Sequence, residues 1–312
     1  MLQKRWPVTE ALWIFALAVS AVIWAGFALL PWGLWRNREV LEGTRAADKG
    51  PLAEITAVIP ARNEAKLIQQ TLLCLAAQGT ALKIILIDDG SNDCTVAVAR
   101  QLAHSNLRII ESAPLPDGWS GKVWALEQAW RQVMTRYILF LDADIKLTPG
   151  SINALEQQMQ QQSAGFISLL AAPSMASGWE KLLMPAFVYF FKALYPFDRV
   201  NSPDSKIAAA AGGCILVETR VLQQIGGFES LKFAVIDDCA FAQRVKSHDF
   251  KIWLGLTHAA ESIRGYKKLT EIGNMVARSA FAQLRYSVAL LVLCTLILVL
   301  LYIAPALMIA SP

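Results

Sequence analysis

The sequence predicts an α/β domain with a mostly parallel sheet and helices on both faces, flanked by a transmembrane helix at each end. Two observations predict the domain: short apolar runs alternate with amphipathic segments from Ile55 onward, and acidic residues follow several of these runs. Such alternation is typical of successive strand–helix units, which pair into parallel sheets. A third observation predicts the flanking helices, because residues 11–35 and 286–312 contain no charged side chain.

Both uncharged runs are long enough to cross a membrane. Each exceeds the ~20 residues that an apolar helix needs to span a bilayer. They belong to a chain of 312 residues, of which 55% are hydrophobic and only 17% charged. We therefore assign transmembrane helices to residues 1–36 and 287–312. A cleaved signal peptide is the alternative for the first run, although its uncharged stretch is longer than a usual signal sequence.

Charge places the region between these runs on one side of the membrane. Basic residues flank the region on both sides, namely Arg36, Arg38, Lys267, Lys268 and Arg285. Because positively charged flanks stay in the cytoplasm, we expect a multi-pass protein of the cell (inner) membrane with a cytosolic domain over residues 37–265. An amphipathic helix in the membrane interface is expected over residues 266–286. The modest net charge of +4, without a basic stripe, argues against nucleic acid as a partner.

The elements of the domain follow from the spacing of its apolar residues. Strands are expected at residues 55–59, 82–87, 107–110 and 137–141, and helices at residues 67–77, 95–103 and 122–134. Residues 137–141 are five apolar residues in a row, as expected for a central strand buried on both faces. The aromatic segment 179–195 predicts a helix in the membrane interface or at a lipid entrance, with burial in the core as the alternative.

Two carboxylates, Asp142 and Asp144, follow the central strand directly. In open α/β sheets, ligands bind beyond the carboxyl ends of the strands, and residues i and i+2 of an extended segment point the same way. A hard divalent cation, Mg²⁺ or Mn²⁺, takes such a pair of oxygen ligands together with diphosphate oxygens. The alternative is a polar strand end or a helix cap before Pro149.

The two preceding strands also end in unusual residues. The first runs into Pro60-Ala61-Arg62-Asn63-Glu64, where the proline ends the sheet ladder and leaves backbone groups for a ligand. The second ends in Asp88 and Asp89, whose carboxylates can accept hydrogen bonds from a nucleobase or a ribose, although a turn at Gly90 explains part of this segment. Gly121 and Lys122 begin a helix, where backbone amides and an ammonium group suit a diphosphate. A simple capping turn is the alternative there.

The second half of the domain contains two further candidate segments. Small residues at positions 208–213, ending in Gly212 and Gly213, let the backbone approach a ligand closely or pack tightly against a helix. Asp237 and Asp238 precede a helical run, so one of them can cap that helix while the other acts as a general base.

Six of these segments occur in an order that resembles the family-2 glycosyltransferases of the GT-A fold. They are residues 58–64, 87–95, 121–122, 141–144, 226–228 and 237–238. The resemblance covers roughly residues 53–250, and with the flanking apolar runs it is closest to the hopanoid-associated (hopene-associated) membrane glycosyltransferases. It implies an inverting, metal-dependent enzyme that moves a sugar from a nucleoside diphosphate donor, expected to be a UDP-sugar, to a lipid or membrane-associated acceptor, with a role in hopanoid metabolism.

Two alternatives to this function stay open. A polyisoprenyl-phosphate glycosyltransferase would use nearly the same donor half, and a catalytically silent membrane scaffold could keep the same fold. The family's membrane synthases also often carry Thr-Glu-Asp where this chain has Ile236-Asp237-Asp238, which argues against a processive polysaccharide synthase.

The resemblance also implies a role for each candidate residue. The donor would contact Pro60, Ala61, Arg62, Glu64, Asp88, Asp89, Lys122, Asp142 and Ala143. Mg²⁺ or Mn²⁺ would bind Asp142 and Asp144. The acceptor would lie near Gly212, Gly213 and Asp237, with Asp238 as the catalytic base.

Overall fold

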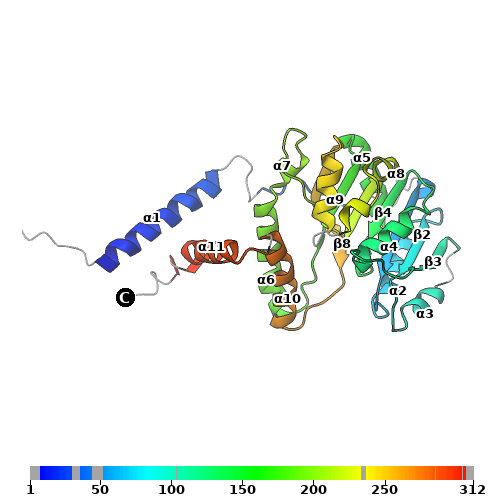
Figure 1. Ribbon diagram of the computed structural model, residues 1–312, viewed down its shortest axis with the longest axis horizontal. Helices are drawn as coiled ribbons and strands as arrows, with labels where there is room; N and C mark the ends of the chain where they lie inside the picture. The colour runs from blue at the N-terminus through cyan, green and yellow to red at the C-terminus, as the bar shows by residue number, and fades with distance from the viewer. Residues whose placement is uncertain are drawn as a thin grey trace, which may run out of the picture. The chain divides into compact units, whose positions relative to one another are not determined.

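The computed structural model (Figure 1) describes residues 8–29, 36–43, 52–102, 105–232, 237–284, 286–303 and 305–306. The chain divides into two compact units. One unit comprises residues 37–272 and contains the whole sheet, whereas the other comprises residues 1–36 and 273–312.

The unit of residues 37–272 contains one sheet of eight strands, in the order β3-β2-β1-β4-β7-β6-β8-β5. The strands are β1 (Ile55–Ala61), β2 (Lys83–Asp88), β3 (Leu107–Glu111), β4 (Tyr137–Leu141), β5 (Ile145–Leu147), β6 (Phe166–Ala172), β7 (Cys214–Glu218) and β8 (Ile252–Ser262). The helices that start in this unit are α2 (Ile68–Ala76), α3 (Thr95–Arg100), α4 (Gly121–Trp130), α5 (Ser151–Gln162), α6 (Gly178–Leu194), α7 (Phe197–Asn201), α8 (Thr219–Ile225), α9 (Asp237–Lys246) and α10 (Leu269–Gln283). Short 3₁₀ turns lie at Leu52–Glu54 and Glu229–Leu231.

The sheet is mixed: six of the described strands run in one direction, as a mostly parallel sheet requires, and β5 and β7 run in the other. Strands β1 to β4 are mutually parallel, as the strand–helix alternation predicted. β7, however, is antiparallel to both β4 and β6, and β5 is antiparallel to β8. The reversal occurs in the second half of the domain, where the sequence lacks the regular alternation that indicates parallel crossovers.

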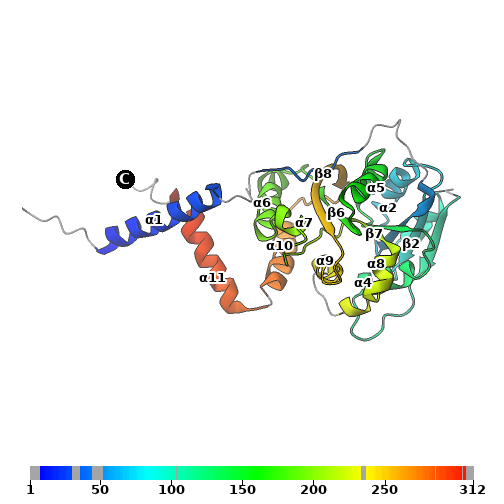
Figure 2. The same cartoon turned by 90° about the horizontal axis from the view of Figure 1, so that it is seen from above.

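The sheet is buried on both faces by two hydrophobic clusters. Val58 and Phe140 point to the cluster beneath α4, α8 and α9, whereas Ile59 and Leu139 point to the cluster beneath α2 and α5. This follows from the alternation of side chains along a strand. Figure 2 shows the sheet between these two groups of helices. All seven elements that the sequence predicted up to residue 141 are present, with ends that differ by at most four residues.

A glycine pair after helix α8 makes a tight turn against the core. Gly226 has φ +81° and Gly227 φ +67°, and the Gly227 N–H donates to the Leu222 carbonyl at 2.8 Å. A Cβ on Gly227 would lie 2.7 Å from Glu127 Oε2 and 2.8 Å from the Trp130 ring, whereas a Cβ on Gly226 would meet nothing within 4 Å. The turn at residues 226–228 is therefore required by the fold.

We expect Gly227→Ala to destabilise the domain far more than Gly226→Ala. Both substitutions place a side chain in the left-handed region at about 1 kcal/mol or slightly more. Only the first also forces a methyl group into a packed site, for a total of about 3 kcal/mol or more. Chemical denaturation of both variants measures the difference. Equal losses of unfolding free energy in the two variants would contradict the packing role.

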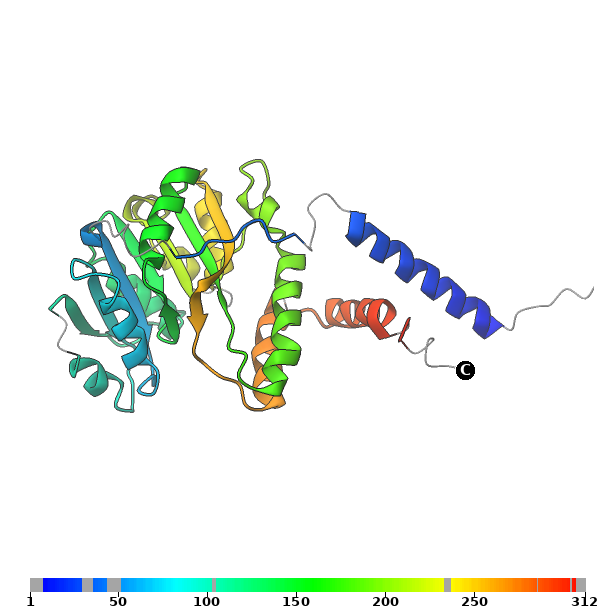
Figure 3. The same ribbon diagram turned by 180° about the vertical axis from the view of Figure 1, so that it is seen from behind.

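The other unit contains α1 (Val8–Leu29), the part of α10 after Ile272, α11 (Val288–Leu298) and a π-helical turn at Val299–Ile303. Figure 3 shows α1 as one continuous helix. The Trp24 Nε1–H donates to the Leu301 carbonyl at 3.1 Å, and the Trp24 and Tyr302 rings meet edge to face.

In the part of the chain that the structure describes, no helix has both the length and the apolar character required to cross a bilayer. The transmembrane helices at residues 1–36 and 287–312 stay predictions, because residues 1–7, 30–35, 304 and 307–312 lie outside the described part of the chain.

Candidate functional site

Three neighbouring strands end at one edge of the sheet. β1 lies between β2 and β4 and is parallel to both, so the carboxyl ends of the three strands meet. Ala61 pairs with Asp88, and the Asp89 N–H donates to the Ala61 carbonyl at 2.9 Å. On the other side, the Asp142 N–H donates to the Gly213 carbonyl at 3.1 Å. The backbone thus brings the predicted donor and acceptor segments to the same edge.

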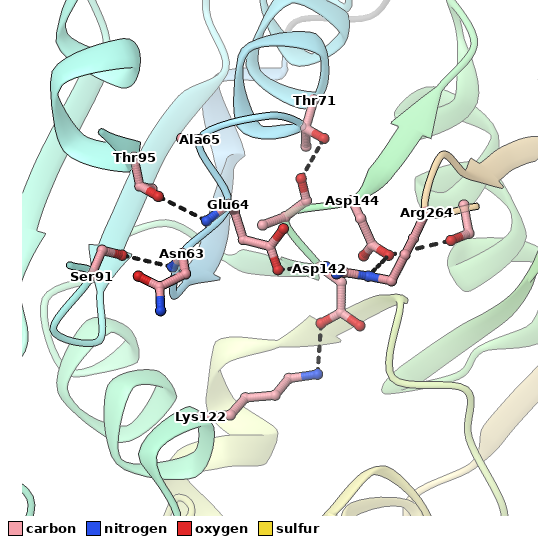
Figure 4. Close-up of polar contacts among 12 residues, drawn as sticks. Asn63, Glu64, Ala65, Thr71, Ser91, Thr95, Lys122, Asp142, Asp144 and Arg264 are labelled. Carbon is pink, nitrogen blue, oxygen red and sulfur yellow. Dashed lines mark hydrogen bonds and ion pairs between the residues drawn. The ribbon is translucent and has the colours of Figure 1, made fainter. Parts of the chain in front are cut away.

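The loops that follow β1 and β2 hold each other through backbone groups. The Asn63 N–H donates to Ser91 Oγ at 2.9 Å, and the Asn92 N–H donates to Asn63 Oδ1 at 2.8 Å. The Glu64 N–H donates to Thr95 Oγ1 at 2.8 Å. Figure 4 shows the contacts of Asn63 with Ser91 and of Glu64 with Thr95 beside Asp142 and Asp144. The loop that carries Glu64 is therefore fixed relative to the loop that carries the two adjacent aspartates.

Asp88 and Asp89 differ in their surroundings. Asp88 is buried, and its Oδ2 accepts the Ser91 N–H at 3.0 Å. Its Oδ1 is buried without a hydrogen-bond partner among the described residues. Asp89 Oδ2 lies 3.5 Å from Arg62 Nη1, and a Cβ on Gly121 would lie 2.2 Å from that same oxygen. The start of helix α4 therefore contacts the loop that follows β2.

Lys122 and Asp142 form an ion pair at the start of helix α4. The Lys122 Nζ–Asp142 Oδ1 distance is 2.6 Å, and both side chains remain partly exposed (Figure 4). The neighbouring Ala143 is buried, and its carbonyl accepts the Thr71 hydroxyl at 2.7 Å. Ala143 thus anchors the chain in the core between the two aspartates, with its side chain in the hydrophobic cluster.

Arg264 is a site residue that the sequence analysis missed. Its Nε donates to Asp144 Oδ2 at 2.9 Å, and its Nη2 donates to Glu64 Oε1 at 2.5 Å. Asp144 Oδ2 also accepts the Ser262 hydroxyl at 3.3 Å. One guanidinium group therefore joins the loop after β1 to the acidic segment after β4, as Figure 4 shows. No sequence motif marks Arg264, which follows a strand that the sequence analysis did not predict.

The site concentrates charge around a partly desolvated carboxyl group. Burial raises the pKa of Glu64, and the adjacent Arg264 opposes that shift, whereas the nearby Asp144 and Asp142 add to it. Three carboxylates, of Glu64, Asp142 and Asp144, face two cations, of Lys122 and Arg264. Their formal charges sum to −3 + 2 = −1.

Asp238 lies on the acceptor side, in the first turn of α9. Its Oδ2 accepts the Gly212 N–H at 2.8 Å, and its Oδ1 accepts the Cys239 N–H at 2.7 Å. A Cβ on Gly212 would lie 3.3 Å from the Asp238 side chain, so a small residue at that position permits the contact. Burial raises the pKa of the Cys239 thiol to about 12, which leaves the carboxylate as the group that can take up a proton.

One cavity connects the donor and acceptor sides. Its polar lining comes from Lys122, Asp142 and Asp238, and its floor from apolar residues of β4, α4, α9 and the turn after α8. The other lining residues are Pro60, Leu126, Phe140, Leu141, Gly212, Ile215, Phe228 and Phe241. Asp89 and Asp144 do not line this cavity; their side chains contact Arg62 and Arg264. The side chain of Asp237 lies outside the described residues.

The residues of this site suit a divalent cation that binds together with a phosphate-containing molecule. Within the described ranges, no three His, Cys, Asp or Glu side chains gather into a metal cage. Asp144 and Glu64 nevertheless share the Arg264 guanidinium group, at 2.9 Å and 2.5 Å. Two carboxylates completed by phosphate oxygens are a usual set for Mg²⁺ or Mn²⁺. At present Lys122 neutralises Asp142. Arg264 neutralises Asp144.

Comparison with known proteins agrees with this geometry. A family model described as Glycosyl transferase family 2 matches residues 56–226, more than half of the chain. A 4,4'-diaponeurosporenoate glycosyltransferase of Staphylococcus aureus (strain MRSA252) is 36% identical over 110 residues, which cover 35% of this chain and 28% of that protein. The protein of the same name from Staphylococcus haemolyticus (strain JCSC1435) is 30% identical over 149 residues, 46% of this chain and 39% of that protein. The matches thus span well under half of these relatives, whose names refer to no hopanoid.

A solved structure shares the fold. The mannosyltransferase PcManGT from Pyrobaculum calidifontis, in complex with GDP-Man and Mn²⁺, aligns with a TM-score of 0.57 and 18% sequence identity. The alignment covers 82% of this chain and 70% of that chain. This supports a GT-A-like α/β fold.

Proposed function

Because the chain belongs to glycosyltransferase family 2 and is a glycosyltransferase, we propose that it transfers a sugar, with inversion, from a nucleoside diphosphate donor to a hydroxyl group of a lipid-like acceptor. One observation carries this proposal. Asp142 and Lys122 from the donor side line the same cavity as Asp238 from the acceptor side. A sugar held between the two sides would therefore have a carboxylate available on the face opposite its leaving group.

The donor's nucleoside would lie against the loops after β1 and β2. Asp88 Oδ1, which is buried and has no partner among the described residues, can accept from a nucleobase N–H. Arg62, in the loop after β1, pairs with Asp89, in the loop after β2. Burial without a hydrogen bond costs about 1–3 kcal/mol, so a ligand that satisfies Asp88 gains that free energy. These side chains suit the hydrogen-bonding groups of either uridine or guanosine.

The diphosphate would lie at the start of α4. Backbone N–H groups of the first helical turn and the Lys122 ammonium both attract phosphate oxygens. A divalent cation held by Asp142, Asp144 and the diphosphate would neutralise the charge that develops on the leaving group. The solved structure that shares this fold was determined in complex with GDP-Man and Mn²⁺.

Asp238 would act as the general base. Two backbone N–H donors fix the orientation of its carboxylate. The acceptor oxygen bonds to the anomeric carbon as the bond from that carbon to the diphosphate oxygen breaks. The proton passes to Asp238, and the nucleoside diphosphate leaves.

A lipid-like acceptor is supported by the relatives and by helix α6. The relatives' names refer to 4,4'-diaponeurosporenoate, a carotenoid. One stripe of α6 exposes large apolar side chains, those of Trp179, Leu182, Phe190 and Leu194. Its opposite face is buried through Glu180, Met184 and Lys192. The Ser177 hydroxyl at the start of α6 donates to the Tyr266 carbonyl at 2.8 Å, which links this stripe to the loop of Arg264.

We expect the paired substitution Leu182→Ser and Leu194→Ser to weaken binding to phosphatidylcholine vesicles by about 10-fold or more, since each buried leucine contributes about 1 kcal/mol or more. Vesicle sedimentation measures the binding. Leu73→Ser, at an exposed leucine of α2, is the matched control and should leave binding unchanged. Undiminished binding by the paired variant would remove α6 from the lipid-facing surface.

Incubation of the purified enzyme with radiolabelled UDP- and GDP-sugars, Mn²⁺ and a membrane lipid extract tests the function as a whole. Label in a lipid product, linked through a hydroxyl oxygen, is the expected result. Label on a phosphate would instead favour the polyisoprenyl-phosphate alternative. No transfer from any donor would contradict the proposal. Attachment to the cytoplasmic face of the inner membrane and a hopanoid acceptor stay predictions from the sequence, which cell fractionation and product analysis would check.

A further inference from the structure

Arg264 occupies a central position in the donor site, although no role follows for it from the sequence. Its guanidinium group bridges Asp144 Oδ2 and Glu64 Oε1, at 2.9 Å and 2.5 Å. The Glu64 and Asp144 side chains are 16% and 14% exposed, whereas Arg264 is 42% exposed. The guanidinium therefore neutralises two largely buried carboxylates while it keeps access to the open side of the site.

The backbone on both sides of Arg264 is fixed. Before it, Ser262 pairs with Ile145 in the β5–β8 ladder, and the Ile263 N–H donates to the Asp144 carbonyl at 2.9 Å. After it, the Tyr266 N–H donates to the Glu180 Oε1 at 2.7 Å. Glu180 belongs to the capping box at the start of α6 and is buried. Because these contacts hold the loop, rotation of the Arg264 side chain can change its partner without a movement of the backbone.

The Asp144 carboxylate would bind two different cations, the Arg264 guanidinium and the divalent metal ion. Asp144 Oδ2 accepts from Arg264 in this structure, and the proposed reaction needs Asp144 as a ligand of a divalent cation. An arginine stays protonated at any working pH, so a guanidinium released from Asp144 keeps Glu64 as one anionic partner and can take a second anion in place of Asp144. A diphosphate can be this second anion, because its oxygens match the planar fork of five N–H donors.

We propose that Arg264 is a positioning residue that holds Asp144 before the donor arrives and then turns to the diphosphate of the bound donor. This inference rests on the proposed function. It implies that a cation alone competes poorly with Arg264 for Asp144, whereas a cation and a nucleoside diphosphate together supply both the replacement partner for Asp144 and the anion for Arg264. The cation and the nucleoside diphosphate would then bind together, and Asp144 and Arg264 would each keep a partner of opposite charge.

Arg264→Gln tests the inference through two binding constants that should change in opposite directions. Mn²⁺ binding without nucleotide, followed by the electron paramagnetic resonance signal of free Mn²⁺, should become about 10-fold tighter or more, because a charged competitor is removed. Binding of UDP and of GDP at saturating Mn²⁺, followed by calorimetry, should become about 10-fold weaker or more. Arg264→Lys keeps the positive charge but loses the planar set of N–H donors. Both of its binding constants should therefore lie between those of the wild type and those of Arg264→Gln.

Arg220→Gln is the matched control, because Arg220 pairs with Glu218 at the opposite edge of the sheet. It should change neither constant. A merely structural Arg264 would weaken both kinds of binding in Arg264→Gln, and unchanged or weaker Mn²⁺ binding in Arg264→Gln and Arg264→Lys would overturn the inference. If the wild-type protein binds neither nucleotide, the proposed function fails, and the Mn²⁺ measurement still decides whether Arg264 competes for Asp144.

Discussion

Asp238→Asn is expected to lower turnover by about 10²–10⁴-fold, the usual contribution of a positioned general base, while the affinity for a nucleoside diphosphate with Mn²⁺ stays unchanged. The reason is positional. Asp238 lies on the acceptor side of the cavity and contacts Gly212 and Cys239, whereas the proposed nucleotide contacts lie at the ends of β1 and β2. Steady-state kinetics and calorimetry of the same preparation separate the two effects.

Two comparisons make this prediction specific. Asp249→Asn changes a carboxylate just before β8, at the opposite edge of the sheet, and should leave turnover unaltered. Because an amide cannot accept both N–H groups that Asp238 accepts, the unfolding temperature of Asp238→Asn should be recorded together with its activity. Full turnover by a folded Asp238→Asn enzyme would contradict the assignment of Asp238 as the general base.

Asp144→Asn is expected to abolish the dependence of nucleotide binding on Mn²⁺. Loss of a group that merely supports a metal ligand commonly costs 10–100-fold in affinity, so loss of a direct ligand should cost about 100-fold or more. Nucleotide at about 100 times its Kd stabilises a protein by about 2.7 kcal/mol. That gain should appear as a higher unfolding temperature for the wild type with UDP or GDP and Mn²⁺, and should vanish in the variant.

The same experiment contains its own check. Lys122 and Asp142 remain in place in Asp144→Asn, so residual binding that no longer responds to Mn²⁺ would come from the diphosphate contacts. Asp249→Asn again serves as the control. A variant in which Mn²⁺ still strengthens nucleotide binding as it does in the wild type would exclude Asp144 as a metal ligand.

Local patterns were sufficient to predict the first half of the fold. β1 to β4 and their helices show clear periodicities, and each strand end with acidic residues follows an apolar run. The carboxyl ends of parallel neighbours must meet, so the convergence of Asp88 and Asp142 at one sheet edge could be predicted without coordinates. The contact between Gly212 and Asp238 joins two segments that the sequence analysis had placed on the acceptor side for separate reasons.

Long-range pairing explains what could not be predicted. β7 reverses direction between β4 and β6, and nothing within Cys214–Glu218 encodes that direction. Arg264 lies 120 residues after Asp144 in the sequence. It reaches the site because β8, which precedes it, pairs with β5. A lone arginine after a strand carries no local signal, so its part in the site becomes visible only when the register of that pairing is known.

The position of bound Mn²⁺ is the most direct test of the central claim, that loops from separate parts of the chain form one site for a cation and a sugar nucleotide. Anomalous diffraction from crystals grown with Mn²⁺ and UDP or GDP would locate the ion. We expect it beside Asp142 and Asp144, with the diphosphate near Lys122. An ion or nucleotide bound away from the carboxyl ends of β1, β2 and β4 would contradict the account.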